Sequence, residues 1–231
     1  MRQGRLETAN EGAEGRRAYS GGRSRRIGFT ERDAEAILAS APAKFAVAGH
    51  SMGGRVALEV VRRAASRVTG LALLDTGYTP LAAGAAGEKE AAGRHELLDL
   101  ARQSGMRAVG ERWLRIPMIH EARLKERKLV ESILQMFERR TPKQFAAQIR
   151  ALLGRPDATR LLPMISCPTL VLCGQDDAWA PLSAHRVMAQ LIAHSTLVTV
   201  PECGHMSTME RPDEVSAALW TWLKRVAKMS A

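Results

Sequence analysis

The 231-residue sequence has few aromatic residues, few cysteines and no long hydrophobic run. Aromatic residues make up 4% of it, so its core must consist mainly of Leu, Val, Ala and Met. The three cysteines, Cys167, Cys173 and Cys203, lack the spacing of metal ligands, which favours reduced thiols and predicts no metal or cofactor. No stretch approaches the roughly 18 apolar residues of a membrane span, and no apolar segment opens the chain. We therefore expect a cytoplasmic protein without a membrane partner.

Negative charge is scarce at the N-terminal end, where residues 1–26 carry seven arginines against three glutamates. This segment is rich in glycine and shows no hydrophobic periodicity, so it is predicted to be a disordered tail. An arginine-rich tail could bind nucleic acid. However, Tyr19 is its one aromatic residue, so we interpret the segment as a solvated charge run and expect no nucleic-acid partner.

The remaining sequence alternates between strand-like and helix-like patterns, which predicts an α/β fold with a mostly parallel sheet covered on both faces. Residues 27–77 and 161–231 are predicted to form its core, and residues 78–160, which have helical periodicity and no strand signal, a helical cap. The predicted strands are Phe45–Ala48, Val68–Leu74, Pro168–Cys173 and Thr196–Val200.

Residues 44–58, KFAVAGHSMGGRVAL, contain the most informative motif. A short apolar strand leads into G-x-S-x-G, and a helical pattern follows, which is the context of a nucleophile elbow. Ser51 would stand on the strained turn, with the amino end of the following helix directed at the reacting oxygen. We expect Gly49 and Gly53 to be required because a Cβ atom at either position would collide with its neighbours. The alternative without a catalytic role is that Ser51 is simply a small residue in a tight turn.

Two further polar groups follow the later strands. Asp176 and Asp177 come after the third strand, and His205 comes after the fourth. Because the carboxyl ends of parallel strands meet at one edge of the sheet, these side chains should lie near Ser51. The order serine, acid, histidine suits acyl transfer with a general base. A loop histidine that merely packs on the sheet is the alternative for His205, and His185 is interpreted as a surface residue.

Four motifs together resemble the α/β-hydrolase family: GHSMGG at 49–54, LALLDTG at 71–77, PTLVLCGQDDAWAP at 168–181 and PECGHMSTMERPDEV at 201–215. The resemblance covers roughly residues 30–226. Within the family, the chain is similar to small bacterial carboxylesterases and pimeloyl-carrier methyl-ester esterases. The resemblance implies a partial α/β-hydrolase fold with a cap. It also implies a serine hydrolase whose partner is a small-molecule ester, including esters that carry an acyl chain.

The resemblance assigns roles to individual residues. Ser51 would attack the ester carbonyl, and His205 would take the serine proton and return it to the leaving alcohol. The acid that orients the histidine would be Asp177, with Asp176 as the second candidate and Asp75, at the end of another strand, as the third.

Met52 would donate one backbone N–H to the oxyanion, because the residue after the nucleophile does so in this family. Members also have strands before the nucleophile strand and a glycine turn that supplies a second donor, and residues 1–43 show neither. We therefore expect the first predicted strand to be an exposed edge that could mediate oligomerisation. Loss of one oxyanion donor costs roughly 10²–10³ in rate. The alternative function is a truncated, catalytically impaired hydrolase or a binding module without activity.

Overall fold

A four-stranded parallel sheet forms the centre of the molecule, as the hydrophobic pattern predicts. The computed structural model describes residues 29–116 and 118–230, and the predicted tail, residues 1–26, lies outside them. The strands are β1 (Phe45–His50), β2 (Val68–Leu74), β3 (Thr169–Gly174) and β4 (Ser195–Val200), in the order β1-β2-β3-β4. Each lies within two residues of its predicted bounds.

Within the described residues β1 is an edge strand, as predicted. It pairs with β2 in a parallel register that sets Gly49 beside Leu73. Its alternate residues Ala46 and Ala48 are exposed, whereas β3 is buried along its whole length. The central strand β3 is therefore covered on both faces, whereas exposure alternates along the edge strand β1.

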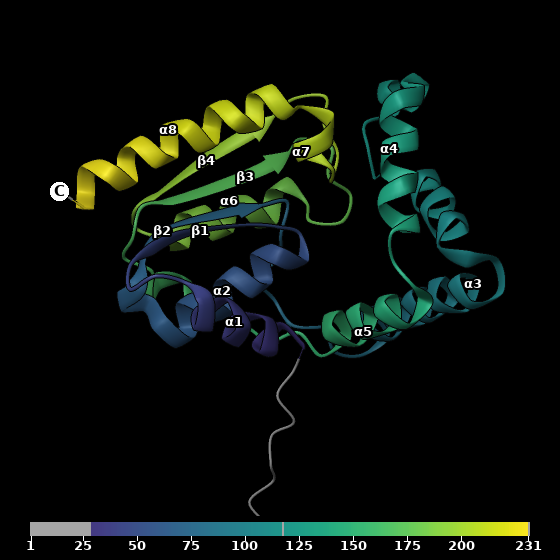
Figure 1. Cartoon of the computed structure of the whole chain (residues 1–231), viewed down its shortest axis with the longest axis horizontal. Coiled ribbons are helices and arrows are strands. Elements are labelled where there is room, and N and C mark those ends of the chain that lie inside the picture. The colour runs from purple at the N-terminus through teal and green to yellow at the C-terminus, as the bar shows by residue number, and fades with distance from the viewer. Residues whose placement is uncertain (1–28, 117, 231) are drawn as a thin grey trace, which may run out of the picture.

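Helices cover both faces of the sheet (Figure 1). Helices α2 (Met52–Ala64) and α6 (Leu182–Leu191) pack on one face, and α1 (Phe29–Ser40) packs on α2. Helix α8 (Pro212–Ser230) packs on the other face, against β2, β3 and β4. Three short elements complete this part of the chain: the 3₁₀ turns η1 (Ala65–Arg67) and η3 (Leu162–Met164), and α7 (Ser207–Glu210).

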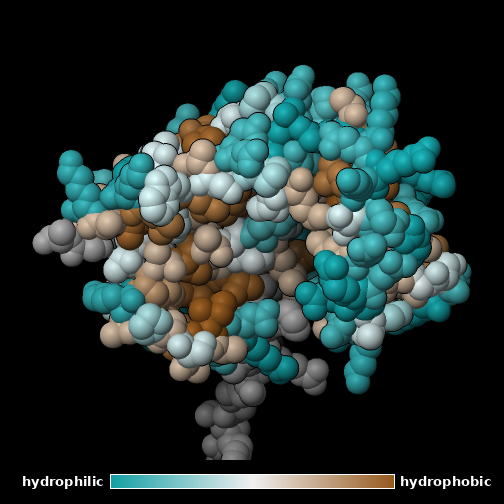
Figure 2. Space-filling model, turned by 45° about the horizontal axis from the view of Figure 1, so that its top comes forward, coloured by the Kyte–Doolittle hydropathy of each residue, from teal (hydrophilic) through white to brown (hydrophobic). Residues whose placement is uncertain are grey.

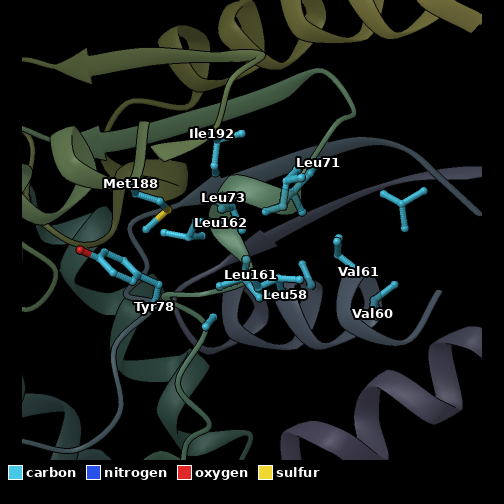
Figure 3. Packing of buried hydrophobic residues seen from close by; sticks show 14 of the residues in the cluster. Leu58, Val60, Val61, Leu71, Leu73, Tyr78, Leu161, Leu162, Met188 and Ile192 are labelled. Carbon is cyan, nitrogen blue, oxygen red and sulfur yellow. The ribbon is translucent and has the colours of Figure 1, made fainter. Parts of the chain in front are cut away.

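The core under α2 and α6 is aliphatic, as the scarcity of aromatic residues requires. Figure 3 shows Leu58 from α2 and Met188 from α6 directed toward Leu71 and Leu73 of β2. These four side chains are fully buried or nearly so. Burial of each stabilises the fold by about 1.5–3 kcal/mol relative to exposure.

The opposite core is built around the side chain of Trp222 on α8, which is buried and donates its indole N–H to the carbonyl of Pro168 at 3.0 Å. A Cβ atom on Gly70 of β2 would lie 2.4 Å from a methyl group of Val226. The close approach of α8 to the sheet therefore depends on this glycine.

Residues between β2 and β3 form helices that stand to one side of the sheet (Figure 1). They are α3 (Ala85–Arg115), η2 (Glu121–Lys125), α4 (Arg127–Glu138) and α5 (Pro142–Leu153). Helix α3 bends at Gly105, whose φ of 82° and ψ of 175° are not helical. Helix α5 begins with a capping box in which Thr141 and Gln144 satisfy each other's backbone N–H groups. These helices share a hydrophobic core of their own.

The two parts of the molecule differ at the surface. Figure 2 shows hydrophobic atoms exposed on the part built by the sheet, whereas the helices beside it present a mainly hydrophilic surface. None of the helices in the described ranges combines the length and the hydropathy that crossing a bilayer requires.

Candidate active site

Ser51 lies in a strained turn between β1 and α2. Its φ of 54° and ψ of −116° are unusual for a residue with a side chain, and such backbone strain costs about 1–3 kcal/mol. Two hydrogen bonds hold the turn: Ser51 N–H donates to Leu74 O at 2.9 Å, and Thr76 Oγ1 donates to Ser51 O at 2.6 Å. Met52 is the first residue of α2, so its N–H is among the amides that helix geometry leaves without an intrahelical acceptor.

The glycines around Ser51 agree with the expectation from the motif at one position and differ from it at another. A Cβ atom on Gly49 would lie 2.2 Å from Gly53 O, so the requirement for Gly49 is confirmed. The same expectation is wrong for Gly53, because a Cβ atom there would meet nothing within 4 Å. Gly54 is the crowded position instead, since its Cβ atom would lie 2.5 Å from Cγ2 of Thr76.

A chain of hydrogen bonds joins Ser51 to a buried acid. Ser51 Oγ lies 2.8 Å from Nε2 of His205, and Nδ1 of His205 lies 2.8 Å from Oδ2 of Asp177. The other oxygen of Asp177 accepts the backbone N–H groups of Trp179 and Ala180 at 2.8 and 2.9 Å. With the carboxylate ionised, Nδ1 carries the proton, so Nε2 is an acceptor for the serine hydroxyl.

The other two candidate acids lie elsewhere. The side chain of Asp176 is half exposed, and its Oδ2 lies 3.8 Å from Nε2 of His120 rather than near His205. Asp75 is fully buried and accepts the backbone N–H of Gly174 at 2.9 Å and the hydroxyl of Ser207. Of the three aspartates, Asp177 is the one that meets the imidazole of His205.

Two further histidines, His50 and His185, belong to the same region of the structure, and the sequence does not single them out. Nε2 of His50 lies 2.8 Å from the carbonyl oxygen of His205 and 3.3 Å from Asp75. Burial by itself lowers the pKa of His50, but Asp75 and the His205 carbonyl outweigh it, so the pKa lies above its ordinary value. The interpretation of His185 as a surface residue is wrong: it is fully buried and accepts the N–H of Thr76 at 3.0 Å. Burial lowers the pKa of His185.

Glu210, also missed by sequence reasoning, holds the loop that carries His205. Its buried carboxylate accepts the N–H groups of Gly204 at 3.0 Å, Met206 at 3.2 Å and His120 at 2.7 Å. Burial raises the pKa of Glu210 against the opposing effect of these donors. Because a single glutamate between two predicted elements looks like any exposed charge, no signal in the sequence distinguishes it.

One group of side chains has the composition of a metal site. Possible ligand atoms of Asp75, Cys173 and Asp177 lie within 4.8 Å of one another. Both carboxylates already accept hydrogen bonds from protein donors. Burial raises the pKa of the Cys173 thiol, which therefore keeps its proton and contacts the carbonyl of Gly174. These three groups suit the internal hydrogen-bond network better than a metal ion.

A cavity of about 430 Å³ lies beside α3, next to the loop of the buried acid. Leu97, Leu100 and Ile116 provide apolar walls, and Trp179, two residues after Asp177, also lines the cavity. Arg94, Glu90 and Arg112 supply charged groups at the same cavity. The cavity has the size and lining of a small-molecule site.

The chain resembles known hydrolases in both sequence and structure. Residues 15–218 match a model described as the alpha/beta hydrolase family. A pimeloyl-[acyl-carrier protein] methyl ester esterase from Xanthomonas oryzae pv. oryzae is 33% identical over 76 residues, 33% of this chain and 30% of the relative. A 2-hydroxy-6-oxononadienedioate/2-hydroxy-6-oxononatrienedioate hydrolase from a Pseudomonas species is 28% identical over 81 residues, 35% of this chain and 29% of the relative.

Among solved structures, a thermophilic esterase from Thermogutta terrifontis, studied with malate bound, is 34% identical and superposes with a TM-score of 0.72. The match covers 80% of this chain and 66% of the esterase. The chain therefore spans about 30% of the length of these two curated relatives and just under two thirds of this esterase.

Proposed function

The chain belongs to the alpha/beta hydrolase family, and we propose that it is a serine hydrolase that cleaves a carboxylic ester through an acyl-enzyme. Ser51 is the nucleophile, His205 the general base and Asp177 the acid that orients it. The substrate is a small-molecule ester. The observation that carries this proposal is the unbroken series of 2.8 Å contacts from Ser51 Oγ through the imidazole to a buried carboxylate.

The geometry suits each chemical step. Ser51 Oγ attacks the ester carbonyl while its proton passes to Nε2 of His205, which then gives that proton to the departing alcohol oxygen. Water then attacks the carbonyl of the acyl-serine while its proton passes to Nε2 of His205. The acid product leaves as that proton returns to Oγ of Ser51. Asp177 stabilises the imidazolium, because it already accepts Nδ1–H and is itself fixed by two backbone N–H groups.

The oxyanion of the tetrahedral intermediate would accept the N–H of Met52, which stands at the amino end of α2. The thirteen-residue helix adds a favourable dipole at this point. The residues between β2 and β3 act as a cap beside the site. Two of the relatives are named as esterases, which supports an ester rather than another acyl bond as the substrate.

A fluorophosphonate probe tests the nucleophile directly. We expect the wild-type protein to be labelled on Ser51 and to hydrolyse p-nitrophenyl butyrate, and Ser51→Ala to lose both properties. Ser132→Ala is the matched control, because that serine is exposed on α4. Folded wild-type protein that is neither labelled nor active would instead support the binding module without activity. Equal turnover by wild type and Ser51→Ala would refute the assignment of the nucleophile.

A further inference from the structure

The loop that carries His205 is bonded to the cap as well as to Asp177. The backbone N–H of His205 donates to the carbonyl oxygen of Met118 at 2.8 Å. Met118 and Ile119 are buried residues of the cap, between α3 and η2. A Cβ atom on Gly204 would lie 2.7 Å from Met118 O and 2.8 Å from Cα of Ile119, so the two backbones touch without room for a side chain. The position of the proposed base therefore depends on the cap.

The carboxylate of Glu210, at the end of α7, joins the same two segments. Its Oε1 accepts the N–H groups of Gly204 at 3.0 Å and Met206 at 3.2 Å, which lie on either side of His205. Its Oε2 accepts the N–H of His120, in the cap, at 2.7 Å. Glu210 is 2% exposed, so protein donors replace water around its carboxylate. We call these three hydrogen-bonded contacts the Glu210 bridge.

The proposed nucleophile is attached to a different part of the molecule. Ser51 is held by hydrogen bonds with Leu74 and Thr76, at and just after the end of β2. Met206, which follows the proposed base, is instead buried in the hydrophobic core of the cap helices. The 2.8 Å contact between Ser51 and His205 therefore joins a group fixed by the sheet to a group fixed by the cap.

A buried carboxylate adds little net stability to a fold, because the loss of its hydration offsets much of what its hydrogen bonds contribute. Hydrogen bonds to a charged acceptor are, however, shorter and roughly twice as strong as neutral ones, so they fix geometry well. We propose that Glu210 is a positioning residue for the reaction, which holds the His205 loop to the cap at His120 and so keeps the base in place for Ser51. The effect on turnover rests on the proposed function, whereas the Glu210 bridge does not.

Glu210→Gln separates the two attachments, because glutamine has one acceptor oxygen, which can meet Met206 or His120 but not both. We expect kcat for p-nitrophenyl butyrate, and the rate of fluorophosphonate labelling, to fall roughly ten- to hundred-fold through misplacement of the base. KM should change less than about three-fold, because His205 serves both formation and breakdown of the acyl-enzyme. Glu214→Gln, exposed on α8, is the matched control and should behave as wild type. A folded Glu210→Gln variant with wild-type kcat and labelling would overturn the proposal.

The cap end of the Glu210 bridge is tested at His120, whose φ of −60° is one that proline adopts. His120→Pro removes the N–H that Glu210 accepts, whereas His120→Ala loses the same imidazole and keeps that N–H. We expect kcat of His120→Pro to lie at least about ten-fold below that of His120→Ala. Equal values would overturn the proposal, and this pair decides the matter if Glu210→Gln does not fold.

Amide hydrogen exchange, followed by NMR, separates the Glu210 bridge from the proposed function. In Glu210→Gln the N–H of Met206 or that of His120 should exchange roughly ten-fold faster than in wild type, because it has lost its acceptor. Unchanged exchange at both residues would overturn the proposal even if the enzyme is active. Faster exchange in a protein that is neither labelled nor active would support the Glu210 bridge and refute the proposed function.

Discussion

Gly54→Ala should destabilise the protein although the G-x-S-x-G motif does not include this glycine. The new Cβ atom would lie 2.5, 2.6 and 2.7 Å from three atoms of Thr76, all shorter than any ordinary contact of a Cβ atom. Thr76 is 1% exposed, and its hydroxyl donates to Ser51 O at 2.6 Å. The threonine therefore cannot move without disturbing the turn that holds Ser51.

The expected cost has two parts. Overpacking of a dense core costs about 1–3 kcal/mol. Losing the hydrogen bond between Thr76 and Ser51 removes about 0.5–1.5 kcal/mol more. We therefore expect Gly54→Ala to lower the free energy of unfolding by about 2–4 kcal/mol. Gly53→Ala, the next residue along, should change stability by less than about 1 kcal/mol, and in the stabilising direction, because its Cβ atom meets open space in a helix.

Urea denaturation followed by circular dichroism measures both variants against wild type. Fluorophosphonate labelling rates then report whether the serine turn is displaced, and we expect slower labelling for Gly54→Ala. The reasoning fails if the two alanine variants lose equal stability, or if Gly53→Ala is the less stable of the two.

Three further predictions concern the acids, acidity and the sheet edge. Asp177→Asn should lower kcat for p-nitrophenyl butyrate by roughly 10³–10⁴, whereas Asp176→Asn should change it less than about three-fold, because Asp177 rather than Asp176 contacts His205, the proposed base; equal losses would contradict the assignment. Because the pKa of His185 is lowered in the fold, the unfolded chain binds a proton first, so stability should fall as pH drops below about 6.5. Urea midpoints at pH 7.0 and 5.5 should therefore differ less in His185→Gln than in wild type, and an unchanged difference would refute this role. The β1 edge, which pairs only with β2 in the described part of the chain, should support concentration-dependent dimers in sedimentation experiments, and lysines at Ala46 and Ala48 should abolish them; monomers at every concentration would contradict this expectation.

Local patterns in the chain were sufficient to predict the strands and the elbow. A buried parallel strand needs an unbroken apolar run, which Val68–Leu74 provides, so its predicted bounds agree with the structure. The periodicity likewise predicts separate helices over 88–104 and 106–116, and the bend at Gly105 lies between them. The exposed pattern of β1 reflects its place at the sheet edge, which the lack of an earlier strand signal anticipates.

Contacts between distant residues were not predictable in the same way. The sequence shows that Ser51, two adjacent aspartates and His205 follow strand ends, but only the fold turns Asp177 toward the imidazole and leaves Asp176 facing solvent. The crowding at Gly54 arises from Thr76, which lies in a loop after β2, and no local sequence pattern indicates that these two residues are in contact.

The sequence by itself therefore determined the fold class, the candidate nucleophile and the order of the proposed catalytic residues, because these depend on local periodicity and on motifs a few residues long. Only the tertiary structure decided which carboxylate meets His205 and which buried groups support that loop. These features depend on side chains brought together from separate elements, and hydrogen bonding and desolvation act over a few ångströms in space rather than along the chain.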